Sequence, residues 1–168
     1  GVLVEKRLYT YCLGWRVSGQ PDSCTVAPTG SEGRALLTDW KITSVWAVQE
    51  GVKQEWEAQL NLYALLMAPA VMMGALRIGA ILRDWSKREA LRNAEYPQMP
   101  FLMLDVPLWP RDQAQAYLEE RVRLHQAARQ ELPECTAEER WARPDQWAVM
   151  KQEREKAMRL IGKKSATS

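Results

Sequence analysis

The sequence has little that would direct it to a membrane or a secretory route. None of its 168 residues fall in a stretch long and apolar enough for a membrane helix, and the first residues lack the basic-then-apolar layout of a signal peptide. The three cysteines, Cys12, Cys24 and Cys135, show no metal-ligand spacing, and an odd count without a secretory signal is typical of reduced thiols. We therefore expect a cytoplasmic protein with no membrane partner.

The chain also has almost no excess of positive or negative charge. The formal net charge of +2 is too small to identify a nucleic-acid partner. The tail 151–164 is more basic, with six lysine or arginine residues against two glutamates, which suits either phosphate contacts or a solvated surface element. The single histidine, His125, shares a helix face with Leu118 and Val122, which favours a core or interface position over a ligand role.

The informative part of the chain is a strand-like stretch that carries two charges. Residues 35–43 have the apolar character of a buried strand. Side chains alternate along a strand, so Asp39 and Lys41 point to one face while Trp40 points to the other. A carboxylate and an ammonium side by side in an apolar strand carry a desolvation cost that a functional role would explain.

Two further pieces of sequence belong with this strand. Asp22 follows a proline on the preceding strand, and a second carboxylate near Asp39 would make a site for a hard divalent cation, which prefers oxygen ligands. Gln59 and Tyr63 lie four apart on one face of an expected helix, where both can reach one target. Each residue also has a plain structural interpretation: Asp22 as a turn residue, Asp39 with Lys41 as an ion pair, Gln59 as a backbone cap and Tyr63 as core.

The sequence resembles the PD-(D/E)XK nuclease superfamily, in the RecB-like, Cas4-like and phage exonuclease-like branch that has a Gln-x-x-x-Tyr helix. The family pattern is matched by Pro21-Asp22, by Asp39-Trp40-Lys41 and by Gln59 with Tyr63. An Asp-x-Lys alone is common by chance, whereas these elements in this order are specific. The resemblance implies a single α/β domain over residues 1–168 with a restriction-endonuclease-like core. Its mixed central sheet would combine an antiparallel meander with a β-α-β crossover, flanked by helices.

The resemblance also implies a metal site. Asp22, Asp39 and the backbone carbonyl of Trp40 would hold Mg²⁺ or Mn²⁺, which lowers the pKa of a bound water and offsets charge in the transition state. Lys41 would orient or help deprotonate that water, or stabilise the charge that develops.

The helix residues would act on the substrate. By resemblance, Gln59 would hydrogen-bond a phosphate or the attacking water, and Tyr63 would contact the DNA backbone or a neighbouring base. Several relatives hold an iron–sulfur cluster with four cysteines, which this chain cannot supply, so we expect no cluster. Relatives often add a metal ligand from a helix before the first strand. That helix is not expected here, which leaves three alternatives: the ligand is absent, a residue such as Glu5 takes its place, or the chain lacks the N-terminal part that its relatives have.

The implied function is DNA cleavage that leaves a 5′-phosphate. We expect an exonuclease of phage or mobile-element type, acting in recombination, repair or replication inside a bacterial or phage-infected cell. The alternatives are a structure-specific or nicking endonuclease, and an inactive DNA-binding module with the same fold. Double- or single-stranded substrate, a homo-oligomer and a recombination partner protein all stay open.

The same patterns predict the order of elements along the chain. We expect an antiparallel meander of three strands, with the second interrupted near Pro21, then a helix and a strand that complete a right-handed crossover, then a further strand and a long helix. In order these are Val2–Cys12, Trp15–Val26, Ala35–Thr43, Gln54–Met67, Ala75–Asp84, Phe101–Val106 and Arg111–Leu132. The segment Trp147–Leu160 suits either a helix, on its Glu and Lys content, or the late strand pair of the family.

Overall fold

The structure is a computed structural model that describes residues 1–26, 34–49, 51–137, 139–140, 142 and 146–149, and the backbone of 159–162. The chain divides into two compact units, Gly1–Gln126 and Ala127–Ser168. The first unit carries the central sheet and all of the expected site residues, while the second holds the antiparallel pair β8 (Gln146–Val149) and β9 (Arg159–Gly162). The late segment is therefore a strand pair at the residues described. The prediction of one domain over the whole chain stays a prediction.

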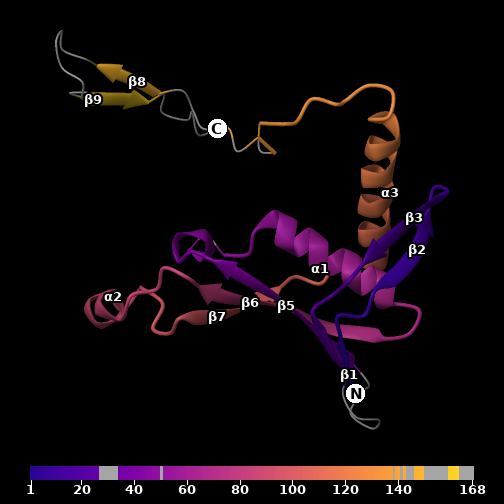
Figure 1. Ribbon diagram of the computed structural model, residues 1–168, viewed down its shortest axis with the longest axis horizontal. Coiled ribbons are helices and arrows are strands. Elements are labelled where there is room, and N and C mark those ends of the chain that lie inside the picture. The colour runs from indigo at the N-terminus through magenta and orange to yellow at the C-terminus, as the bar shows by residue number, and fades with distance from the viewer. Residues whose placement is uncertain are drawn as a thin grey trace. The chain divides into compact units, whose positions relative to one another are not determined.

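The first unit is an α/β structure built on a mixed five-stranded sheet with the order β1-β4-β5-β6-β7. All neighbouring strands are antiparallel except β5 and β6, which are parallel and joined through helix α1 (Figure 1). The strands of this sheet are β1 (Val2–Val4), β4 (Ser23–Val26), β5 (Arg34–Thr43), β6 (Met72–Leu82) and β7 (Phe101–Val106). The helices are α1 (Gln54–Met67), α2 (Lys87–Arg92) and α3 (Arg111–Ala127), with a single 3-10 turn, η1 (Trp46–Val48).

The first two predicted strands form one long hairpin that bends in the middle. Its outer half is the separate ribbon of β2 (Leu8–Cys12) and β3 (Trp15–Gly19), and its inner half is β1 paired with β4. Both halves keep the same register, and at the bend Glu5 N donates to Asp22 O at 3.1 Å. Glu5 has a φ of 47°, so the first strand is interrupted there, which the alternation of its side chains did not predict. The predicted interruption of the second strand near Pro21 is confirmed.

Helix α1 covers one face of the sheet and encloses the main core. Trp56, Leu60 and Met67 pack from the helix against Leu37 and Ile78 of the sheet. The spacing of these helix residues predicted the helix, and its bounds are as expected. Strand β6 begins three residues earlier than expected, because Gly74 takes up a register shift against β5 and lets the pairing extend back to Met72.

Helix α3 is shorter than expected. Its buried residues are Ala114, Leu118 and Val122, and the helix ends at Ala127. Beyond that point Leu132 is 81% exposed, so no packing supports a further turn, and helix propensity alone rarely does so. The core hypothesis for His125 is wrong, because its side chain is exposed; the interface hypothesis stays untested. Within the described residues, no helix has both the length and the apolar character to cross a membrane.

Candidate active site

The register between β4 and β5 places Asp22 beside Asp39. Strand β4 begins at Ser23, opposite Thr38, so β5 continues past the end of its neighbour. The backbone N–H of Trp40 then has no partner on β4, and Asp22 Oδ2 accepts it at 2.7 Å. Because side chains alternate, Trp40 lies on the opposite face of the sheet, where its ring covers Gly79. This hydrogen bond holds Asp22 on the backbone of β5 one residue from Asp39, near enough for its charge to raise the pKa of Asp39.

Asp39 is a buried carboxylate held close to a single ammonium group. The residue is 2% exposed, and Oδ2 lies 2.6 Å from Lys41 Nζ. Among the described residues that oxygen has no hydrogen-bond partner of good geometry, so the ion pair is its main compensation. Burial raises the pKa of Asp39, the adjacent ammonium of Lys41 lowers it, and the charge of Asp22 raises it. The balance is a raised pKa, and burial is its largest cause.

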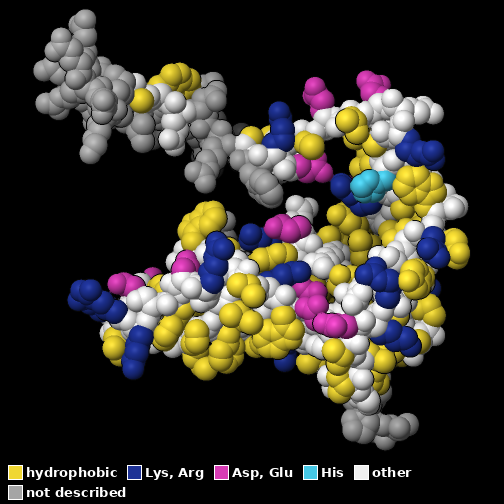
Figure 2. All heavy atoms as spheres, viewed as in Figure 1, with side chains coloured by type: hydrophobic (Ala, Val, Ile, Leu, Met, Phe, Trp, Pro, Cys, Tyr) yellow, Lys and Arg dark blue, Asp and Glu magenta, His cyan; other side chains and the backbone are white. Residues whose placement is uncertain are grey.

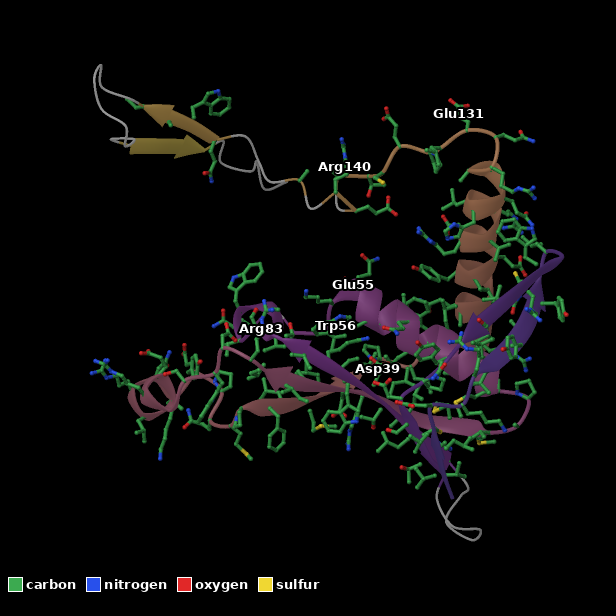
Figure 3. All side chains as sticks on the ribbon, viewed as in Figure 1. Asp39, Glu55, Trp56, Arg83, Glu131 and Arg140 are labelled. Atoms are coloured by element: carbon green, nitrogen blue, oxygen red, sulfur yellow. The ribbon has the colours of Figure 1, made fainter. Side chains whose placement is uncertain are left out.

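Lys41 begins a short chain of hydrogen bonds that ends on α1. Lys41 Nζ donates to Gln59 Oε1 at 2.8 Å, and Gln59 Nε2 donates to Tyr63 OH at 2.8 Å. A lysine ammonium can only donate, so it sets the orientation of the glutamine amide. Since the Tyr63 hydroxyl accepts from Gln59, its own proton is left to donate to another acceptor. Contacts therefore link four predicted side chains in series between β5 and α1: Asp39, Lys41, Gln59 and Tyr63. The fifth, Asp22, joins them from the start of β4 through the backbone of Trp40; Asp39 is labelled in Figure 3.

Gly19 explains how Tyr63 reaches this place. A Cβ at Gly19 would lie 2.7 Å from Tyr63 Cε1 and 2.8 Å from Leu66 Cδ1, closer than Cβ atoms approach such neighbours. The aromatic ring packs directly against the backbone at the bend of the hairpin, which only glycine permits. The sequence placed Gly19 in the same stretch as Asp22, but the reason for a glycine there appears only in three dimensions.

The oxygen atoms at this point suit a hard divalent cation. Ser23 Oγ donates to Thr38 O at 3.3 Å, so the carbonyl of Thr38 faces β4. Backbone groups two residues apart share an edge of a strand, and the carbonyl of Trp40 therefore faces the same side as the Asp22 carboxylate. Two carboxylates and a carbonyl are the ligand types that Mg²⁺ and Mn²⁺ prefer. A cation here would be held by both carboxylates and would offset the repulsion between them.

Three other expectations concern Glu5, the cysteines and the basic tail. Glu5 lies at the bend through its backbone, but its side chain is exposed, and no three acidic, histidine or cysteine side chains gather into a metal-binding group in the ranges that the structure describes. Glu5 is thus not placed as a third ligand. Cys12 and Cys24 are buried and Cys135 is exposed, all as free thiols, and burial raises the pKa of the first two. The side chains of the basic tail 151–164 lie outside the described residues.

Sequence reasoning missed Asn61, the buried polar residue that holds α1 to the chain before α3. Its Nδ2 donates to the carbonyls of Glu57 and Pro107, both at 2.9 Å, and its Oδ1 accepts from Trp109 N at 2.8 Å. Asn61 is buried two residues after Gln59, so these bonds fix the turn of α1 that presents Gln59 to Lys41. An asparagine within an otherwise apolar helical run was the available signal.

Comparisons with known proteins leave the family open. No family model matches the chain, and no curated protein matches it. The crystal structure of a protein called SSO0001 is similar with a TM-score of 0.46 and 12% sequence identity, over 73% of this chain and 50% of that one. The chain thus spans about half the length of that structure. The nuclease hypothesis depends on the residues and on the geometry that they form.

Proposed function

We propose that this protein is a metal-dependent nuclease that hydrolyses phosphodiester bonds in DNA and leaves a 5′-phosphate. The observation that supports it most is the meeting of two carboxylates, Asp22 and Asp39, with the ammonium of Lys41. A structural ion pair would need Lys41 alone. Asp22 also accepts a hydrogen bond from the backbone of Trp40, but its charge repels that of Asp39, and a cation held by both carboxylates would offset this repulsion.

Each side chain has a role that its contacts support. Asp22 and Asp39, with the carbonyl of Trp40, would hold Mg²⁺ or Mn²⁺, which when bound makes a water molecule more acidic and offsets negative charge on the phosphate. Lys41, held by Asp39 and Gln59, is positioned to orient that water or to stabilise the developing charge.

The remaining donors suit the substrate. The free proton of the Tyr63 hydroxyl can be given to a phosphate oxygen, since its oxygen already accepts from Gln59. Gln59 has both ends of its amide engaged, so it acts on the substrate through Lys41 and Tyr63, or after releasing one of them. The fold proposed with this function is the restriction-endonuclease-like core.

The test is an incubation with linear duplex, single-stranded and circular DNA, with Mg²⁺, with Mn²⁺ and with a chelator. Degradation of linear DNA while circles stay intact indicates an exonuclease, the form that we favour, and nicked circles indicate an endonuclease. DNA binding without any cleavage would support the inactive module instead. That second candidate is favoured by the ligand number, because the described residues contain no group of three or more acidic, histidine or cysteine side chains at the site.

Lys41→Ala should lower the cleavage rate by at least about 100-fold, as the loss of a group that stabilises transition-state charge does. Lys87→Ala, on the exposed surface of α2, is the matched control and should cut at the parental rate. Lys41→Ala also leaves Asp39 without its ion pair, so Gln59→Ala, which retains that pair, supplies a second test and should lower the rate partially. Parental rates in both site variants would show that the site is assigned wrongly.

A further inference from the structure

The β2–β3 ribbon has one packed face and one open face. On the packed face Cys12 of β2 lies in a core cluster with Leu118 and Val122 of α3, and Trp15 and Val17 of β3 pack against it. Because side chains alternate, the neighbouring residues of both strands point away from α3. This outer face of the ribbon consists of Tyr9 and Tyr11 on β2, Arg16 and Ser18 on β3, and Arg7 just before β2.

The outer face presents two aromatic rings to solvent. Tyr9 is 55% exposed and Tyr11 is 75% exposed. They are two residues apart on one strand, hence about 7 Å from each other, and they point to the same side. An ordinary solvent-facing hairpin carries polar side chains at such positions. Two adjacent exposed rings are instead typical of surfaces on which the bases of a single nucleic-acid strand stack.

The same face carries only positive charge. The guanidinium of Arg16 lies 5.2 Å from the centre of the Tyr9 ring, and Arg7 donates to Ser18 Oγ at 3.2 Å and to Gln20 Oε1 at 2.8 Å. Between Glu5 and Asp22 the chain contains no acidic residue, whereas it contains Lys6 and both arginines. Figure 2 shows basic and hydrophobic side chains next to one another over β2 and β3. This charge is complementary to a polyanion.

The ribbon also leads to the candidate active site. Strand β3 ends at Gly19, and three residues later the chain reaches Asp22. The bond from Arg7 to Gln20 lies on that connection, so the last cation of the outer face is joined to the loop that carries the carboxylate. The ribbon is thus continuous, through three residues of chain, with the loop that carries the Asp22 carboxylate.

We propose that the outer face of the β2–β3 ribbon binds single-stranded nucleic acid and guides it to the active site. Two successive bases stack on Tyr9 and Tyr11, and Arg7 and Arg16 meet phosphates of the same stretch of strand. The choice of a nucleic acid rather than another polyanion rests on the proposed function. The stacking of bases on the tyrosines defines the substrate class. We expect DNA with an unpaired end, because bases within a duplex offer no free faces to Tyr9 and Tyr11.

The test measures binding and not cleavage. Binding is followed by fluorescence anisotropy, with a chelator present to prevent cleavage. The two labelled probes are an oligo(dT) of about fifteen nucleotides and a duplex of equal length. Tyr11→Ala and Tyr9→Ala should each weaken single-strand binding about fivefold or more. Tyr11→Phe, which retains the ring, should bind as the parent does, and this rescue separates stacking from a hydrogen bond of the hydroxyl.

The arginine is tested through salt. Arg16→Ala should reduce the slope of log affinity against log salt concentration by about 0.7, the share of one phosphate contact in a single strand. Arg88→Ala on α2 is the matched control and should leave the slope unchanged. Circular dichroism should show that every variant is folded, because the substituted side chains lie on the open face.

The outcomes separate this proposal from the proposed function. Unchanged oligonucleotide affinity in the Tyr9→Ala, Tyr11→Ala double variant, with cleavage retained, would overturn the ribbon site and leave the nuclease. Oligonucleotide binding that depends on Tyr9 and Tyr11, without cleavage under any metal condition, would overturn the nuclease and leave the ribbon site. Tighter binding of the duplex than of the single strand would overturn the substrate class. A dimer in analytical ultracentrifugation that Tyr11→Ala dissociates would show that the face is covered by a second copy of the chain instead.

Discussion

Replacement of Asp39 by asparagine should stabilise the protein at neutral pH while removing its activity. Asn keeps the shape of the side chain and an oxygen for Lys41, but it carries no charge. In the folded protein burial raises the pKa of Asp39 despite the neighbouring ammonium, so the ionised form is less favourable there than in the unfolded chain. The substitution removes that cost.

The expected gain follows from the burial of the site. Asp39 has a nearly inaccessible side chain, and its partner Lys41 retains 24% exposure, so the attraction between them is partly screened. Relief of the desolvation cost, with the Asn oxygen still next to Lys41, should add on the order of 1 kcal/mol to the free energy of unfolding. For a chain of this size that corresponds to a rise in Tm of about 2–4 °C.

The gain should depend on pH in a defined direction. An aspartate whose pKa is raised in the folded state stabilises that state at low pH, where its carboxyl is protonated. This contribution is lost as the pH rises from the usual aspartate pKa through the raised pKa of the folded state. The difference in Tm between Asp39→Asn and the parent should therefore be absent in acid and grow towards neutral pH. Thermal unfolding followed by circular dichroism between pH 4 and pH 8, in buffers matched to about 0.1 M ionic strength, measures it.

Metal binding gives a second measurement that needs no cleavage. If Mn²⁺ binds at Asp39, a concentration of about 100 times the Kd should stabilise the parent by about 2.7 kcal/mol, which raises Tm by about 5–10 °C. In Asp39→Asn this shift should largely disappear. Asp105→Asn is the matched control, because Asp105 is exposed and pairs with Arg77 at 2.7 Å on the other face of the sheet. It should change stability by no more than about 0.5 kcal/mol and keep the response to Mn²⁺.

A less stable Asp39→Asn at pH 7.5, together with an undiminished Mn²⁺ shift, would refute the reasoning. It would mean that the carboxylate is a net stabilising member of an ion pair and that the cation binds elsewhere.

Two further substitutions test how the site is supported. Gly19→Ala should lower the free energy of unfolding by about 1–3 kcal/mol and reduce cleavage, because its Cβ displaces the ring of Tyr63. Gly1→Ala is the control, since a Cβ there meets open space, and it should change neither the urea midpoint nor the cleavage rate. Asn61→Ala should cost about 1–3 kcal/mol by leaving Trp109 N and a carbonyl unpaired, and a urea midpoint equal to that of the parent would contradict this account of the buried amide.

Local patterns determined the parts of the site that lie on a single element. The alternation of side chains placed Asp39 and Lys41 on one face of β5, and helical spacing placed Gln59 beside Tyr63 on α1. Both follow from backbone periodicity, which is a property of neighbouring residues. The helix Gln54–Met67 and the strand Phe101–Val106 were predicted with their observed bounds for the same reason.

The sequence alone therefore tells which side chains share a face, since this depends only on the repeat of a strand or a helix. Which faces meet is settled by the packing of the elements in three dimensions. The register of β4 against β5 sets Asp22 on the backbone of Trp40, and the bend of the hairpin packs Gly19 against Tyr63. The same bend separates the β2–β3 ribbon from the sheet and leaves its tyrosines in solvent. These contacts join residues far apart in the chain, and their energies depend on packing and burial that no local repeat encodes.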